Sequence, residues 1–193
     1  MFKHSWKKEL LTIPNFLSLF RLLLIPVYIR MYLQAETSLD YYMAGTVLGI
    51  SCLTDLVDGK IAREYPMISN VGKLLDPLAD KLTQLALMLS LSKAYRILYP
   101  ILILFLVKEL FQFITLLIFA RKGKFLPGAL LSGKICTAVL FISLLLLVLF
   151  PGIPYDTVRI LMAADAVLLL YAFWGYANAY FGKSVKLTDL QNE

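Results

Sequence analysis

The chain has few of the residues that build disulfide frameworks, zinc sites and soluble surfaces. It contains two cysteines and one histidine in 193 residues, and only 17% of its residues are charged. A typical soluble domain carries about 25% charged residues. Cys52 and Cys136 both lie in apolar stretches and are interpreted as small buried side chains, so no disulfide framework is predicted. His4 lies in a basic segment and is expected at the surface.

Hydrophobic residues, by contrast, make up 60% of the chain. Six runs approach the ~20 apolar residues that a membrane-spanning helix needs. These runs cover residues 16–33, 41–63, 73–92, 97–120, 130–150 and 157–181. Short breaks separate them, and the sequence has no long linker and no internal repeat. The predicted fold is therefore an all-α integral membrane protein, a bundle of six transmembrane helices that forms one domain over residues 1–193.

The distribution of basic residues predicts an orientation in the membrane. Residues 1–12 are cationic and contain aromatic side chains, so they are expected to form a short amphipathic segment on the membrane surface rather than a cleaved signal. Most of the loop lysines and arginines fall on one side of the bundle: Lys3, Lys7, Lys8, Lys60, Arg63, Lys73, Arg121, Lys122, Lys124, Lys134, Lys183 and Lys186. Such residues favour the cytoplasmic side. Both termini and the loop after residue 63 are therefore predicted to be cytoplasmic, in a protein of the plasma membrane.

The net charge of +6 also bears on the partners of the protein. It fits an anionic lipid surface better than nucleic acid, because the basic residues are spread over short loops and no groove-reading motif occurs. Membrane lipids are therefore expected partners, and nucleic acid is not.

The segment "TDLVDGKIAR", residues 54–63, places charges beside an apolar run. At 100° per residue, one face of about 140° carries two carboxylates, two small residues and a guanidinium. These are Asp55, Asp58, Gly59, Ala62 and Arg63. Ionisable groups at membrane depth are functional by default. This face is therefore a candidate site.

A second stripe follows in residues 72–80, where Gly72, Asp76 and Asp80 are spaced by four residues. The short loop between the two segments makes them antiparallel neighbours, so the four aspartates are expected to face one another. Carboxylates that converge in an apolar setting need a positive partner. Oxygen ligands without a nearby histidine or cysteine favour Mg²⁺ or Mn²⁺. Four carboxylates could hold two ions, which are commonly used in phosphoryl displacement.

Each aspartate also has a simpler interpretation. Asp55 could end a helix, Asp58 and Gly59 could form a turn, and Asp76 could be an N-cap followed by Pro77. These interpretations do not explain why the aspartates share helical faces. A divalent-cation transporter is a further alternative from another class, although transporters more typically show repeated halves.

The stretch "DLVDGKIAREYPMISNVGKLLDPLAD", Asp55–Asp80, reads D-x-x-D-G-x-x-A-R-x8-G-x-x-x-D-x-x-x-D. It resembles the signature of the CDP-alcohol phosphotransferases at every defined position. The resemblance implies transfer of a phosphatidyl group from CDP-diacylglycerol to an acceptor hydroxyl, with CMP leaving, in a Mg²⁺- or Mn²⁺-dependent homodimer.

The resemblance also implies roles for the residues of the signature. Asp55, Asp58 and Asp76 would be metal ligands, and Asp80 would approach the metals and act as the general base. Four further positions would shape or contact the CDP moiety: Gly59, Ala62, Arg63 and Gly72. A catalytically silent member of the family is the remaining alternative to an enzyme.

The acceptor is expected to bind three cations outside the signature, Arg21, Lys108 and Lys134. "IPNFLSLFRLLLIP" (13–26) and "GKICT" (133–137) resemble segments of phosphatidylglycerophosphate synthases and of CMP-forming cardiolipin synthases. Lys108 precedes Glu109 where the former usually have Arg-Glu, and lysine lacks the bidentate fork of arginine. This pair could instead be structural. Glycerol-3-phosphate is the predicted acceptor, and phosphatidylglycerol, which would give cardiolipin, is the alternative.

The last apolar run contains two further features. Asp165 is a charge well within it and is expected either to pair with Arg21, Lys108 or Lys134 or to be protonated. Its larger aromatic residues are expected to form an interfacial belt. They are Tyr171, Trp174, Tyr176 and Tyr180.

Overall fold

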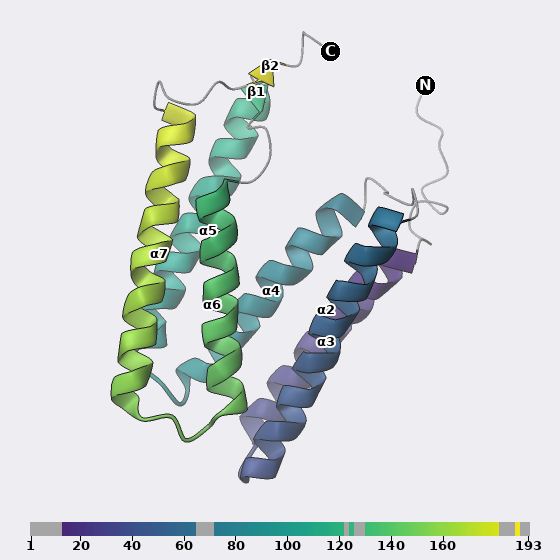
Figure 1. Cartoon of the computed structure of the whole chain (residues 1–193), viewed down its shortest axis with the longest axis vertical. Helices are drawn as coiled ribbons and strands as arrows, with labels where there is room; N and C mark the ends of the chain where they lie inside the picture. The colour runs from purple at the N-terminus through teal and green to yellow at the C-terminus, as the bar shows by residue number, and fades with distance from the viewer. Residues whose placement is uncertain (1–12, 65–71, 122–123, 126–129, 182–187, 190–193) are drawn as a thin grey trace. The chain divides into compact units, whose positions relative to one another are not determined.

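The computed structural model of the chain describes residues 13–64, 72–121, 124–125, 130–181 and 188–189 (Figure 1). The helices are α2 (Ile13–Gln34), α3 (Ser38–Glu64), α4 (Gly72–Ser92), α5 (Leu98–Arg121), α6 (Leu131–Leu149) and α7 (Tyr155–Phe181). Two short strands, β1 (Lys124–Phe125) and β2 (Thr188–Asp189), pair in an antiparallel register. Each helix matches one of the six apolar runs to within a few residues. The expected interfacial segment at residues 1–12 lies outside the described residues.

The prediction of six transmembrane helices is confirmed only in part. Four of the described helices are long and apolar enough to cross a membrane, namely α2, α5, α6 and α7. This is the composition of an integral membrane protein. The helices α3 and α4 are similarly long, with 27 and 21 residues. Of the charged residues of the candidate site, α3 carries Asp55, Asp58 and Arg63, and α4 carries Asp76 and Asp80. Those charges lower the apolar content of both helices.

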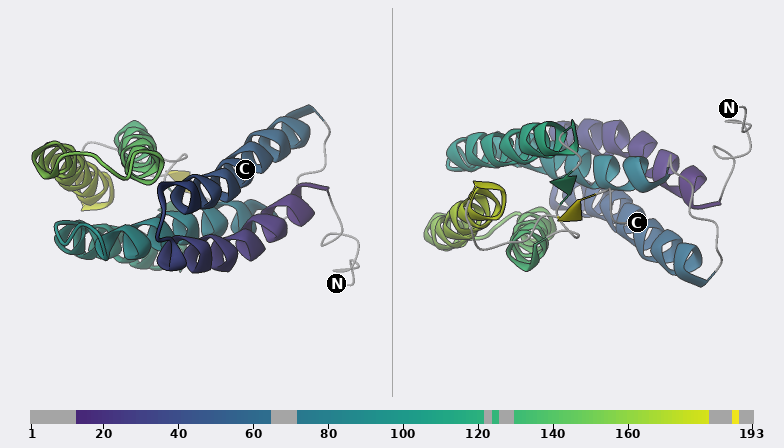
Figure 2. Two further views of the ribbon diagram at one scale, coloured as in Figure 1. Left: turned by 90° about the horizontal axis from the view of Figure 1, so that it is seen from below. Right: turned by 90° about the horizontal axis from the view of Figure 1, so that it is seen from above.

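The chain divides into two compact units, which are described separately. The first contains α2, α3, nearly all of α4 and residues 148–151, and the second contains α5, most of α6 and α7. In the first unit α2 packs against α3. Figure 2 shows these two helices meeting at the turn that joins them and separating towards the end where α2 begins and α3 ends. In the second unit α5 packs against α7 through rings such as Phe111 and Phe173, whose centroids lie 4.6 Å apart.

The start of α3 is defined by a reciprocal cap. The Asp40 carboxylate accepts hydrogen bonds from the backbone N–H and the hydroxyl of Thr37, both at 2.8 Å, and from the backbone N–H of Glu36. The backbone N–H of Asp40 in turn donates to the Thr37 hydroxyl at 3.4 Å. This is the pattern of a capping box. The hydrogen bonds from Thr37 and Glu36 stabilise the carboxylate and lower the pKa of Asp40.

Candidate functional site

The first apolar helix carries a buried polar stripe on one face. Asn15, Ser18 and Arg21 follow one another at intervals of three residues in α2, and all three are buried. Residues three apart lie on the same side of a helix. Of this stripe, only Arg21 is among the residues predicted from the sequence. The regular spacing of Asn15 and Ser18 in an otherwise apolar span is the signal that could have identified them.

The stripe contacts the two aspartates of α4. The Ser18 hydroxyl donates a hydrogen bond to Oδ1 of Asp76, and Nη1 of Arg21 donates to Oδ1 of Asp80 at 2.5 Å. The Arg21 side chain is 3% exposed and that of Asp80 is 49% exposed. The later residue of α2, Arg21, contacts the later residue of α4, Asp80. The two helices therefore run parallel where they meet, and one α2 face holds both α4 carboxylates.

The remaining residues of the signature lie on helical backbone. Asp55, Asp58, Gly59, Ala62 and Arg63 belong to α3, which continues to Glu64, and Gly72 is the first residue of α4. Their side chains lie outside the described ones. The convergence of the two aspartate stripes therefore stays a prediction.

The backbone nevertheless excludes the simpler interpretations of the aspartates as helix ends, turns or caps. Asp58 and Gly59 are in the interior of α3 rather than in a turn, and Asp55 is two turns or more before its end. Asp76 is not an N-cap, because α4 begins at Gly72 and Pro77 lies inside it. These acids are thus not explained by caps or turns.

The donor chemistry of the described part of the site fits a hard divalent cation. Asp76 and Asp80 are one helical turn apart and offer carboxylate oxygens, which Mg²⁺ and Mn²⁺ prefer. Ser18 occupies one oxygen of Asp76 and leaves the second carboxylate oxygen for another partner. No group of three or more potential metal ligands occurs among the described side chains, which do not include those of Asp55 and Asp58.

A second polar cluster lies within the other unit, around Lys108 of α5. Its Nζ is 2.6 Å from Oε1 of Glu109, and the Lys108 side chain is 3% exposed. The same nitrogen lies 5.9 Å from the centre of the Tyr176 ring. The ring also reaches Gly133 of α6, where an added Cβ would be 2.5 Å from the tyrosine oxygen. Tyr176 thus connects Lys108 with the glycine–lysine segment, whereas Lys134 itself is exposed.

The aromatic belt predicted for α7 is wrong for two of its four residues and stays a prediction for the other two. Tyr171 and Trp174 are exposed, but Tyr176 and Tyr180 are buried. The 3.6-residue period of the helix explains the difference, because residues that follow closely in sequence turn to different faces. Burial of Tyr176 is what allows it to contact both α5 and α6.

Asp165 is buried in α7, and its described partner is a hydroxyl. Its Oδ1 lies 3.3 Å from Oγ of Ser143 in α6, and its Oδ2 has no hydrogen-bond partner among the described residues. The ion pairs of Arg21 and Lys108 go instead to Asp80 and Glu109. Asp165 therefore serves as a polar contact between α6 and α7.

The close approach of Tyr176 to Gly133 gives a first prediction. We expect Gly133→Ala to lower the melting temperature by several degrees, because the new methyl group must displace the ring and overpacking costs about 1–3 kcal/mol. Gly49→Ala in α3 is the matched control, since a Cβ there meets nothing within 4 Å. Thermal unfolding of both purified variants would measure the difference. Equal melting temperatures would show that the contact is not tight.

Comparisons with known proteins extend over both units. A family model for CDP-alcohol phosphatidyltransferases matches residues 11–174. The chain is similar to a CMP-forming cardiolipin synthase from Streptomyces coelicolor, with 32% identity over 178 residues, which cover 90% of this chain and 79% of that protein.

Two further relatives carry other names. A probable phosphatidylglycerophosphate synthase from Mycobacterium tuberculosis is 29% identical over 165 residues, covering 84% of this chain and 78% of the relative. A CDP-diacylglycerol–glycerol-3-phosphate 3-phosphatidyltransferase from Aquifex aeolicus is 38% identical over 141 residues, covering 71% and 74%. The names of the relatives thus divide between cardiolipin synthesis and phosphatidylglycerophosphate synthesis.

Proposed function

The chain belongs to the CDP-alcohol phosphatidyltransferase family, and from this premise we propose that it transfers a phosphatidyl group from CDP-diacylglycerol to glycerol-3-phosphate. The products are phosphatidylglycerophosphate and CMP. The observation that carries the proposal is the pair of α4 carboxylates, Asp76 and Asp80, held against α2 within the segment that matches the family.

In the proposed mechanism Asp80 is the general base. Its side chain is 49% exposed, so an acceptor hydroxyl can reach the carboxylate. The proton of that hydroxyl passes to Asp80 while the hydroxyl oxygen bonds to the phosphorus of the phosphatidyl group. The bond between that phosphorus and the oxygen of CMP breaks, and CMP leaves with the electron pair.

Two divalent ions, Mg²⁺ or Mn²⁺, would be held by the four aspartates of the signature, Asp55, Asp58, Asp76 and Asp80. When bound, the ions supply positive charge that offsets the charge of the pyrophosphate and of the departing CMP.

Four residues of the signature are proposed to bind the CDP moiety. Gly59, Ala62 and Gly72 are small and allow a bulky ligand close to the helix backbone. Arg63 provides a guanidinium that suits a phosphate. All four belong to α3 or to the first turn of α4.

The acceptor is proposed to interact with the cations Lys108 and Lys134. A phosphorylated alcohol needs such cations more than a neutral one does. Lys108 forms an ion pair with Glu109, and this pair weakens the attraction of Lys108 for a phosphate. For that reason CMP-forming cardiolipin synthesis from phosphatidylglycerol is kept as the second candidate, and the relative from Streptomyces coelicolor favours it.

The membrane arrangement completes the proposal. We infer that α3 and α4 also cross the membrane, so that residues 1–193 form a single domain of six spans preceded by an interfacial segment. The site lies at the cytoplasmic side of the plasma membrane, because the basic loops follow the positive-inside pattern. A homodimer is proposed from the family resemblance.

A CMP-release assay with CDP-diacylglycerol and a panel of acceptors tests the function. We expect release with glycerol-3-phosphate and little with serine or inositol, because the proposed cations favour an acceptor that carries a phosphate. Inositol phosphate in the same panel shows whether any phosphorylated alcohol is accepted. Activity with phosphatidylglycerol alone would instead identify a cardiolipin synthase. Divalent-ion binding without CMP release from any acceptor would favour a transporter or a silent family member.

A further inference from the structure

Arg21 is buried in a helix that otherwise has the composition of a membrane span. It is 2% exposed, and Ser18, one turn earlier, is 0% exposed. An ionised side chain inside such a helix is costly unless it meets an opposite charge or a polar cavity. The structure provides that opposite charge in Asp80.

Arg21 and Asp80 differ in how much of each side chain is exposed, and this difference indicates different roles. The Arg21 side chain is 3% exposed, whereas that of Asp80 is 49% exposed. An acceptor molecule can therefore reach the carboxylate but has almost no surface of the guanidinium to contact. This geometry argues against the expectation that Arg21 binds the acceptor directly. It suits a residue that supports Asp80 from the protein interior.

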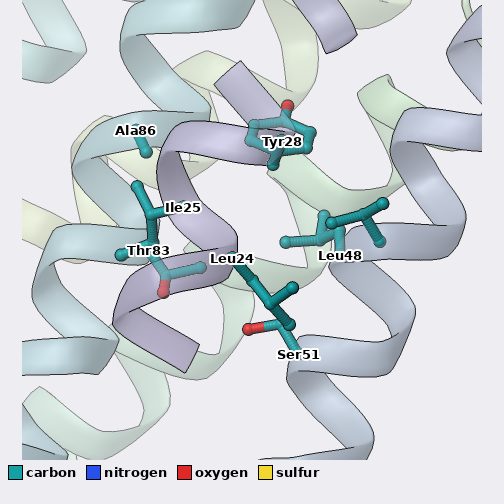
Figure 3. A pocket seen from close by; sticks show the side chains of 8 residues that line it. Leu24, Ile25, Tyr28, Leu48, Ser51, Thr83 and Ala86 are labelled. Carbon is teal, nitrogen blue, oxygen red and sulfur yellow. The ribbon is translucent and has the colours of Figure 1, made fainter. Parts of the chain in front are cut away.

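The helices α2 and α4 also share a small pocket next to the pair. One turn further along both helices, a pocket with room for roughly one water molecule is lined by Leu24 and Ile25 of α2 and by Thr83 and Ala86 of α4 (Figure 3). The Thr83 hydroxyl donates to the backbone carbonyl of Ala79 at 2.8 Å. It is thus already engaged within its own helix. This side of the pair is thus lined mainly by apolar side chains, whereas Asp80 itself stays half exposed.

The second contact repeats the first, one turn earlier on each helix. Ser18 donates to Asp76 as Arg21 donates to Asp80. Two contacts between the same two rigid elements define the position of α4 along α2 as well as the direction of both carboxylates. A single contact would leave α4 free to pivot about it.

We propose that Ser18 and Arg21 are positioning residues, which aim the carboxylates of Asp76 and Asp80 from α2. Arg21 acts through Asp80 on proton transfer, and Ser18 acts through Asp76 on metal binding. The proposal rests on the proposed function and goes beyond it, because it assigns Ser18 a role and moves Arg21 from acceptor binding to support of the base.

Steady-state kinetics with purified protein distinguish the two roles of Arg21. We expect Arg21→Gln to lower kcat by roughly 10- to 100-fold, the usual effect of losing an orienting partner, while the KM for glycerol-3-phosphate changes less than about twofold. Arg21→Lys should recover part of the rate, since it keeps the charge. Lys134→Ala is the contrasting variant and should raise that KM. A raised KM in Arg21→Gln with unchanged kcat would overturn the positioning role.

A double-mutant cycle keeps the test independent of folding. If Arg21 acts through Asp80, Arg21→Gln should cause no further loss of rate in an Asp80→Asn background. A loss as large as in the native background would contradict the proposal. Thermal unfolding of each variant would show whether its helices remain packed.

The role of Ser18 has a readout other than turnover. We expect Ser18→Ala to weaken Mn²⁺ binding by roughly tenfold, as measured by electron paramagnetic resonance of the purified protein, and Ser18→Thr to retain it. Unchanged Mn²⁺ affinity in Ser18→Ala would overturn this part. If the native protein released no CMP, the proposed function would fail. If the native protein released CMP but the rate losses of Arg21→Gln and Asp80→Asn simply added in the double mutant, the proposed function would stand and only the positioning role of Arg21 would be removed.

Discussion

An Asp80→Asn protein is expected to release CMP about 10²- to 10⁴-fold more slowly than the native protein. Positioned general bases contribute rate factors of this size, and an amide of the same shape cannot take the acceptor proton. Binding of CDP-diacylglycerol should change much less, because the proposed contacts of the CDP moiety come from other residues. CMP release and binding of a non-reactive CDP-lipid analogue would measure the two effects separately.

Asp156→Asn is a suitable control for this substitution. Asp156 lies in the first turn of α7, its side chain is 90% exposed, and its ion pair with Arg159 spans 3.6 Å at the surface. Exposed pairs of this kind contribute little to stability, so the control should retain native turnover. A native rate in Asp80→Asn would mean that another group accepts the proton.

Removal of divalent cations is expected to reduce CMP release to background. A chelator should abolish activity, and addition of Mg²⁺ or Mn²⁺ should restore it to the native protein. Zn²⁺ should restore the activity poorly, since the proposed ligands are all carboxylates and Zn²⁺ prefers sites with histidine or cysteine. Asp55→Asn and Asp76→Asn should stay inactive after the same addition, because each loses a charged ligand.

The metal prediction has a direct control in the same titration. Asp156→Asn should respond to chelator and to Mg²⁺ as the native protein does, because its side chain is at the surface. Full activity of chelator-treated native protein would exclude a role for divalent ions in the reaction. Full activity of Asp76→Asn would exclude this residue as a ligand.

The fold could be predicted well because hydrophobicity dominates the sequence. All six apolar runs became helices, since a stretch without water must satisfy its backbone hydrogen bonds internally. The prediction that every helix crosses the membrane was confirmed less completely, because α3 and α4 are not among the four helices apolar enough to do so. The charged residues proposed for the site lower their apolar content, so composition alone does not identify these two helices as spans.

The site could be predicted only where its residues form a pattern within one segment. Asp76 and Asp80 were identified from their spacing, and the structure adds that α2 is what contacts them. Ser18 was missed because one serine in an apolar helix is distinctive only through its three-residue spacing from Asn15 and Arg21. Arg21 was expected to face an anion, and the anion that it contacts is a side chain of the protein. Which residues of two separate helices meet depends on packing, which no single segment encodes.

During synthesis the ion partner of Arg21 arrives late, because Asp80 follows it by 59 residues. At about 5–20 residues per second, roughly 3–12 s pass between the two. An arginine at the centre of an inserting helix costs about 2.5–3.5 kcal/mol in translocon measurements. The pair with Asp80 cannot offset any of this cost until α4 is made. The contact between α2 and α4 is therefore completed only after the third helix of the described chain has been synthesised.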